Sequence, residues 1–210
     1  MSAVSISTPI KIGLSGKRRS GKSSVTRYLV AKGCIQQMHS RVVSHGAWLK
    51  HLAQSGLGIS PTDREGLQKF GTEYLLDSCE RVYGHRDIIT NWVLSETAQA
   101  VEDGVHLVIC DDVRYRHQAD LLHKAGFRLY RLDTTPELQA SREQEGKSAG
   151  DDEHPSETDL DDYEHFDLRL NPDLNVASIA DVIMQHVLAH SYVTSYTTYT
   201  TVGDSNVSEE

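Results

Sequence analysis

Short apolar runs alternate with helical stripes along most of the chain. The runs at 10–14, 105–110 and 127–133 are rich in β-branched, Leu and aromatic residues and predict strands, with a shorter strand at 167–171. The run at 105–110 is apolar at almost every position, which is typical of a strand buried on both faces. This β-α alternation predicts an α/β fold with a parallel sheet and right-handed crossovers.

Between the strands, apolar residues recur every three or four positions and predict amphipathic helices. A helix from Lys22 is expected to stop at Gly33, and another covers 44–53. The next helix is capped by Thr62 or Asp63, and its apolar stripe comprises Leu67, Phe70, Tyr74, Leu75, Cys79 and Val82. Further helices are expected over 85–101 and 117–125, and another begins at Thr134 or Thr135. The last predicted helix, over 176–188, is strongly periodic.

Two segments lack such a stripe. Nine of the seventeen residues in 151–167 are acidic, which predicts an exposed, mobile segment. The end of the chain, over 191–210, is rich in Ser, Thr and Tyr, and we expect a disordered tail there. The rest, 1–190, is expected to form one domain.

Composition narrows the class of partner. The net charge of −9 over 210 residues disfavours binding to a nucleic-acid strand. Cys34, Cys79 and Cys110 are scattered, without disulfide or zinc spacing, and the eleven histidines show no paired-ligand spacing. No export signal or membrane-spanning run is present, so we expect a cytoplasmic protein with no membrane partner.

The segment from Gly16 to Ser23 fits the phosphate-binding pattern G-x-x-x-x-G-K-[ST]. It lies between a predicted strand and a predicted helix, where backbone N–H groups and the helix N-terminus attract anions. Lys22 is expected to reach the β- and γ-phosphates of a nucleotide, and Ser23 to bind Mg²⁺. A chance match in a glycine-rich basic turn is the alternative, and the strand-loop-helix context argues against it.

Two carboxylates and two guanidiniums follow the strand at 105–110. Asp111, Asp112, Arg114 and Arg116 would lie at the carboxyl end of the sheet, facing the phosphate-binding loop. One Asp could bind the Mg²⁺ shell while an Arg clamps a phosphate. A helix-capping Asp with solvated arginines is the simpler alternative.

Four stretches together resemble the bacteriophage deoxynucleoside monophosphate kinase family, and more distantly the animal-type phosphomevalonate kinases. They are "SGKRRSGKSS", "REGLQKFGTEYLLDSCERVYG", "VICDDVRYRHQADLLHKAGF" and "HPSETDLDDYEHFDLRLNPD". The resemblance spans roughly 10–190 and implies a three-layer P-loop kinase fold, with a sheet flanked by helices and a mobile lid over about 142–165.

The resemblance also implies roles for particular residues. The ATP phosphates would be held by Gly16, Lys17, Arg18, Ser20, Gly21, Lys22, Ser23 and Ser24. Lys22, Asp112, Arg114 and Arg142 would be catalytic, Ser23 and Asp112 would bind Mg²⁺, and Arg64, Arg81 and Arg116 would bind the acceptor. His154 and Glu157 would contact nucleotide on lid closure, or else belong to a solvated acidic loop.

Two positions depart from the family pattern. Ser23 stands where many relatives have Asp, which suits an ordinary Mg²⁺-binding loop. Gln118 stands where an acidic residue is common, which leaves the identity of the acceptor open.

The function expected is therefore transfer of the γ-phosphoryl group of ATP to a deoxynucleoside monophosphate, with ATP and Mg²⁺ required. Three alternatives stay open: a hydroxyl acceptor such as 5-hydroxymethyluracil in phage DNA, phosphomevalonate as acceptor, and a non-enzymatic nucleotide-binding regulatory module. The acidic charge balance makes DNA the weaker partner, and the sequence leaves open whether the chain forms a homodimer.

Overall fold

A parallel sheet organises the molecule. In the computed structural model, which describes residues 9–142, 153–171 and 173–202, five strands pair in the order β2-β3-β1-β4-β5. Every pairing is parallel, and β1 lies in the centre between β3 and β4. The strands are β1 (Ile10–Ser15), β2 (Ser40–Val43), β3 (Leu107–Val113), β4 (Arg128–Leu132) and β5 (Leu168–Leu170).

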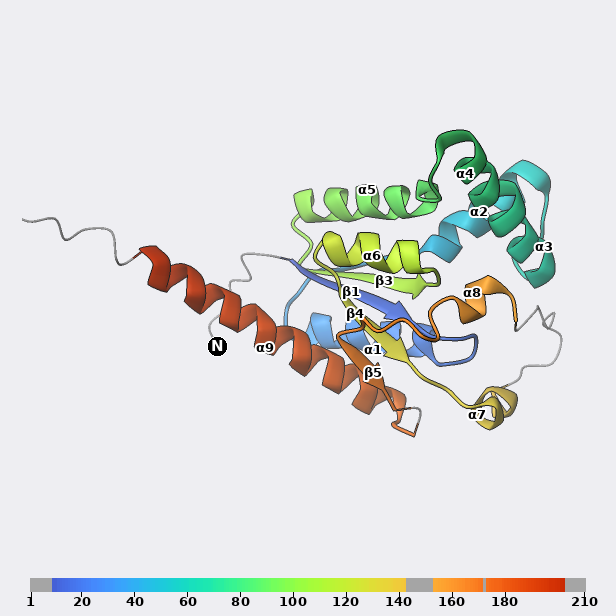
Figure 1. Cartoon of the computed structure of the whole chain (residues 1–210). Helices are drawn as coiled ribbons and strands as arrows, with labels where there is room; N and C mark the ends of the chain where they lie inside the picture. The colour runs from blue at the N-terminus through green and yellow to red at the C-terminus, as the bar shows by residue number, and fades with distance from the viewer. Residues whose placement is uncertain (1–8, 143–152, 172, 203–210) are drawn as a thin grey trace, which may run out of the picture.

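Helices cover both faces of this sheet, which gives three layers (Figure 1). On one face α1 (Lys22–Ile35) and α9 (Val176–Val202) pack together, and Leu29 and Ile183 join Ile12 of β1 in one apolar core. On the other face lie α5 (Ile88–Glu102) and α6 (Arg116–Lys124), which contribute Val93 and Leu122 to a second core. The sheet is therefore buried on both sides, as the sequence predicted for an α/β fold.

A third group of helices extends beyond the carboxyl ends of the strands (Figure 1). It comprises α2 (His45–Leu57), α3 (Arg64–Lys69), the π-helix η1 (Phe70–Leu76) and α4 (Asp77–Tyr83). The stripe predicted over this region is wrong at Tyr74 and Val82, which are 63% and 68% exposed. A π-helix has more residues per turn than an α-helix. Tyr74 lies in η1 and Val82 follows it in α4, so both side chains are rotated away from the face that a regular α-helix would bury.

One strand and two boundaries differ from the prediction. Strand β2, a four-residue edge strand in which only Val43 is buried, was not predicted from the sequence. Helix α1 does not stop at Gly33 but continues to Ile35, and a Cβ at Gly33 would lie 2.7 Å from Oγ of Ser40, so the glycine allows close packing and does not end the helix. Strand β3 extends beyond 110 to Val113 and includes both predicted carboxylates.

The acidic segment is not the exposed loop that its composition predicted. Within its described part, 153–167, Leu160 and Tyr163 are buried in the core on the α5–α6 face, and Glu157 is only 4% exposed. The short helix α8 (Pro155–Thr158) carries Glu157. Burial is possible here because arginines and a backbone N–H bind the carboxylates, as described below. The remainder of the expected lid, 143–152, lies outside the described residues.

The chain end also differs from the prediction. Residues 191–202, expected to belong to a disordered tail, continue the helix α9, while 203–210 lie outside the described residues. Across 9–142, 153–171 and 173–202, no helix combines the length and the apolar character that a membrane-spanning helix needs.

Candidate active site

The phosphate-binding loop connects β1 to α1 and takes its shape from two glycines. Gly16 has φ +151°, and a Cβ there would lie 2.6 Å from the carbonyl oxygen of Leu132. Gly21 has φ +96° and immediately precedes α1, whose N-terminus is not capped by a side chain within the described residues. The first N–H groups of α1 are thus directed at the loop, as in an anion site.

Lys22 is buried at the start of α1, and its ammonium group lies inside the loop. Its Nζ donates to the carbonyl oxygens of Gly16 at 2.5 Å and Lys17 at 3.1 Å. Burial and the nearby Arg114 lower the pKa of Lys22 to about 7. An anion bound in the loop would favour the charged form of this amine.

At the end of β3, Asp112 and Arg114 form a close ion pair. Nε of Arg114 lies 2.5 Å from Oδ1 of Asp112. Burial alone would raise the pKa of Asp112, but Arg114 and Lys22 lower it to about 2, so this carboxylate is ionised at neutral pH. Burial raises the pKa of the neighbouring Asp111, with the negative charge of Asp112 adding to the effect.

Glu157 of α8 connects the loop to two arginines of the cavity. Its side chain is only 2% exposed. Oε1 accepts from Nη2 of Arg64 at 2.6 Å and from Nη1 of Arg114 at 2.8 Å, while Oε2 accepts from the backbone N–H of Arg18 at 2.7 Å. The solvated-loop alternative for Glu157 is therefore wrong. His154 caps α8 and lies 3.3 Å from the hydroxyl of Thr72.

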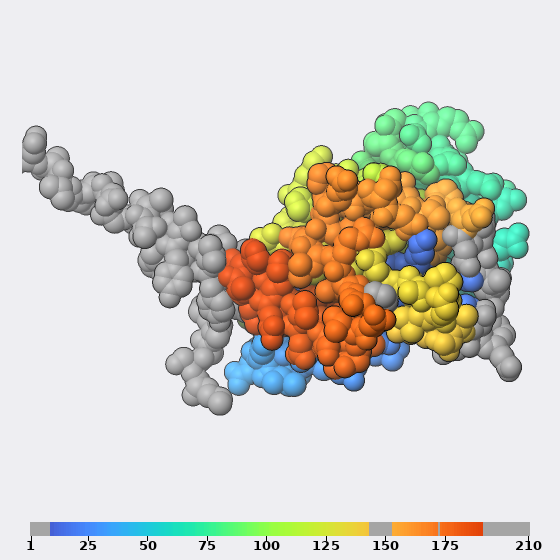
Figure 2. All heavy atoms as spheres, turned by 60° about the horizontal axis from the view of Figure 1, so that its bottom comes forward, coloured from blue at the N-terminus to red at the C-terminus, as the bar shows by residue number. Residues whose placement is uncertain are grey.

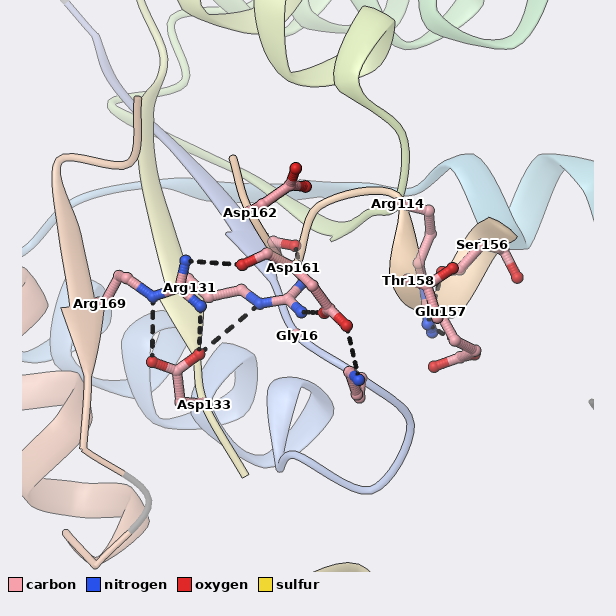
Figure 3. A network of polar contacts seen from close by, with 12 residues as sticks. Gly16, Arg114, Arg131, Asp133, Ser156, Glu157, Thr158, Asp161, Asp162 and Arg169 are labelled. Atoms are coloured by element: carbon pink, nitrogen blue, oxygen red, sulfur yellow. Dashed lines mark hydrogen bonds and ion pairs between the residues drawn. The ribbon is translucent and has the colours of Figure 1, made fainter. Parts of the chain in front are cut away.

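A second network attaches the acidic segment to the base of the loop (Figure 3). Asp161 binds Nζ of Lys17 at 2.7 Å and Nη2 of Arg131 at 2.6 Å. Arg131, at the end of β4, is 5% exposed and donates from Nη1 to the hydroxyl of Ser15 at 3.0 Å. Asp133 bridges Arg131 and Arg169. This network fixes the position of the segment relative to β1 and β4.

A cavity of about 990 Å³ opens over the carboxyl ends of the strands. It brings together most of the predicted site residues: Arg18, Ser20, Gly21, Lys22, Ser23, Ser24, Arg64, Asp112, Arg114 and Arg142. Arg142 follows α7 (Pro136–Ser141) and donates from Nη1 to the carbonyl oxygen of Arg19 at 2.9 Å. In Figure 2, blue atoms from the early part of the described chain are visible between the yellow region around α7 and the orange region around α8.

Four predicted residues do not line this cavity. Gly16, the first residue of the loop, is not among the lining residues, and Lys17 is paired with Asp161. Arg81 is exposed on α4. Arg116 forms ion pairs with Asp159 and Asp162. Gln118, where the sequence departs from the family pattern, caps α6 by accepting from the backbone N–H groups of Arg114 and Tyr115.

Other residues at the site were not predicted from the sequence. Lys50, Trp92 and Glu96 line the cavity, whereas the sequence predicts only a helix over 85–101 for the last two. The sequence signal that could have found two of them is the four-residue spacing of Trp92 and Glu96, which places both side chains on one face of the predicted helix. The burial of Arg131 was not predicted, because its closest carboxylate partner, Asp161, lies 30 residues away in the sequence.

The fold and the cavity define the class of protein. A shikimate kinase from Acinetobacter baumannii is 16% identical, with a TM-score of 0.53 over 90% of this chain and 98% of that one. The crystal structure of APE1195 is 18% identical, with a TM-score of 0.55 over 87% and 97% of the two chains. The chain has the three-layer fold of a P-loop kinase, with the phosphate-binding loop between β1 and α1.

One curated relative extends this finding. A protein of Acanthamoeba polyphaga mimivirus, provisionally named a deoxynucleotide monophosphate kinase, is 25% identical over 77% of this chain and 87% of its own length. No family model matches the sequence. Together the comparisons support an enzyme of the kinase type, that is, a phosphotransferase.

Proposed function

We propose that the protein is an ATP-dependent kinase of deoxynucleoside or nucleoside monophosphates, which forms the diphosphate and ADP. The observation that carries this proposal is that Lys22 in its phosphate-binding loop and the guanidiniums of Arg64 and Arg114 line one cavity. One phosphate site thus lies close to a second group of cations. The name of the mimivirus relative supports the same acceptor class.

The donor would bind in the loop with Mg²⁺. The hydroxyl of Ser23 and the carboxylates of Asp111 and Asp112 line the cavity, and Oδ1 of Asp111 is buried without a hydrogen-bond partner among the described residues. These hard oxygen donors fit Mg²⁺, which usually binds one or two carboxylates together with substrate phosphates. When bound, the ion would neutralise charge on the transferring phosphoryl group.

The cations of this chain suit an acceptor that is already anionic. A phosphate oxygen needs no general base for attack, so catalysis depends on alignment and charge neutralisation. Lys22 and Arg142 are arranged around the loop to provide that charge, and Arg114 faces the acceptor together with Arg64. Arg64 on α3 lies on the acceptor side.

The experiment is ADP release from ATP and Mg²⁺ with a panel of dNMPs and NMPs as acceptors. We expect acceptor-dependent release with one or a few monophosphates. Lys22→Ala should reduce it by about 10²–10³-fold or more, whereas Lys124→Ala, at the exposed end of α6, should match the wild type. ATP binding without turnover on any acceptor would contradict the proposal and favour a regulatory nucleotide-binding module.

A hydroxyl acceptor is the second candidate, and Asp111 favours it. This carboxylate lines the cavity and has a raised pKa caused by burial, properties that suit a general base for a hydroxyl group. The panel therefore includes DNA containing 5-hydroxymethyluracil, with phosphomevalonate as a further phosphate acceptor. A hydroxyl acceptor predicts a large loss of rate in Asp111→Asn together with activity on hydroxyl compounds only.

The lid expected over 142–165 and the bacteriophage affiliation stay predictions. Lid closure would protect this region from proteolysis when ATP and the acceptor are both present. Cleavage that does not change on adding both ligands would count against closure.

A further inference from the structure

Three hydrogen-bond donors from distant parts of the chain converge on one carboxylate. Glu157 binds the backbone N–H of Arg18, Nη2 of Arg64 and Nη1 of Arg114, which lie 139, 93 and 43 residues away in sequence. With a side-chain exposure of 2%, Glu157 is shielded from solvent. Charge-assisted hydrogen bonds in such a site are strong and geometrically restrictive.

The two guanidiniums share a single oxygen atom. Arg64 and Arg114 both bind Oε1 of Glu157, so their positive groups face each other across this atom. Without the carboxylate, two cations this close together would repel each other. Glu157 is thus the counter-ion that lets both arginines occupy the same side of the cavity.

The arginines retain donors for a ligand. Arg114 uses Nε and Nη1 in its contacts and Arg64 uses Nη2, so Nη2 of Arg114 and Nη1 of Arg64 make no hydrogen bond within the described residues. Both side chains line the cavity, whereas Glu157 does not. Glu157 therefore acts on any ligand through the two arginines and without contact of its own.

We propose that Glu157 is a positioning residue that aligns Arg64 and Arg114 as a two-guanidinium fork for the acceptor phosphate. This inference rests on the proposed function. Through its Oε2, Glu157 also ties the fork to the phosphate-binding loop at Arg18, which fixes the distance between donor and acceptor sites. Displacing such a fork by about 1 Å can reduce a rate about 10²-fold.

The first test is Glu157→Gln, which keeps the size of the side chain and removes its charge. We expect kcat/KM for the acceptor monophosphate to fall roughly 10- to 100-fold, mainly through KM. KM for ATP should change by less than about threefold, because the arginines of the fork lie on the acceptor side. Asp162→Asn is the matched control, because Asp162 pairs with Arg116 on the surface outside the cavity and its side chain is 83% exposed.

A double-mutant cycle separates positioning from a merely structural role. If Glu157 acts through Arg64, then Arg64→Ala should reduce kcat/KM for the acceptor. The double variant with Glu157→Gln should then show a total loss much smaller than the product of the two single losses. Glu157→Asp covers the case in which the Gln variant fails to fold. It keeps the charge but withdraws it by one methylene, so acceptor KM should rise while the unfolding temperature stays close to that of the wild type.

The outcomes distinguish this inference from the proposed function. An unchanged or lower acceptor KM in Glu157→Gln overturns the inference, since the carboxylate would then merely occupy the phosphate site. Equal losses for ATP and acceptor, or multiplicative effects in the cycle, overturn it in favour of a structural role. If the wild type phosphorylates no monophosphate, the proposed function fails separately. Binding of inorganic phosphate, measured by calorimetry with a non-hydrolysable ATP analogue present, then decides: weaker binding in Glu157→Gln supports the fork, and equal or tighter binding overturns it.

Discussion

The phosphate-binding loop over 16–23 and the acidic segment over 153–167 meet at the same end of the sheet but are held there by different interactions. The loop is shaped by neighbouring residues, through positive φ at its glycines and bonds such as Ser20 N–H to the carbonyl of Lys17. The segment has one short helix and is held by core contacts of Leu160 and by ion pairs with cations far away in sequence. Changes in the loop should therefore affect ATP binding most. Changes in the core contacts and surface ion pairs of the segment should mainly affect stability, whereas Glu157 is expected to act on the acceptor through its two arginines.

Gly16→Ala should give the largest effect. The new Cβ would lie 2.5 Å from Oγ of Ser20 within the loop, at a φ that L-residues rarely adopt. We expect ATP affinity, measured by calorimetry, to fall by about 100-fold or more, because the loop must move out of its anion-binding shape. Gly56→Ala is the control, because nothing lies within 4 Å of a Cβ there. Unchanged ATP affinity in Gly16→Ala would show that the loop is not locally shaped.

Leu160→Ala tests whether core contacts hold the acidic segment in place. Leu160 is 1% exposed in the core on the α5–α6 face, so its truncation should lower the free energy of unfolding by about 2–5 kcal/mol, measured by urea denaturation. Leu57→Ala, at a position that is 63% exposed, should change it by less than about 0.5 kcal/mol. Equal effects at the two positions would mean that the segment does not pack into the core.

The same contrast explains what could be predicted from the sequence. The loop, the strand buried on both faces and the caps at Asp63 and Thr135 are local patterns, and the structure confirms them. The burial of Glu157 was not predictable, because it depends on arginines that become its neighbours only when the chain folds. The edge strand β2 was missed because its four residues, SRVV, are too short a run to show a strand pattern, and pairing with β3 makes it a strand.

The pH dependence of ATP binding sharpens the description of the loop. With its pKa lowered to about 7 by burial and by Arg114, most of Lys22 is neutral at pH 8 in the free protein. The phosphates of ATP should favour the charged amine, so binding at pH 8 should take up close to one proton. Calorimetry in buffers of different ionisation enthalpy measures this uptake. Lys22→Met should abolish it, and uptake that persists in this variant would assign the proton to another group.

The lowered pKa of Lys22 also makes the stability of the fold depend on pH, in the opposite direction to ATP affinity. The folded pKa of Lys22 lies below its ordinary value of 10.5, so between about pH 7 and 10.5 the unfolded chain binds more protons. The contribution of Lys22 to the free energy of unfolding therefore rises with pH across this window, while ATP affinity falls. The ionised Asp112, with a pKa of about 2, should add no inflection near neutral pH.

Asp161→Asn should give the smallest effect and tests the ion pairs that join the two regions. It weakens the contacts of Asp161 with Lys17 and Arg131, but Arg131 keeps Ser15 and Asp133 as partners. Because the Asp161 side chain is 40% exposed, solvent screens these pairs, and we expect a loss of about 1 kcal/mol in urea denaturation. Asp162→Asn, on a surface ion pair, should cost less than about 0.5 kcal/mol. The Asn variant also frees the ammonium group of Lys17 to turn toward phosphates bound in the loop, so ATP affinity should stay equal or increase slightly. A fall in ATP affinity without a loss of stability would mean that the segment shapes the loop, and the contrast between a locally formed loop and a segment held by distant partners would no longer hold.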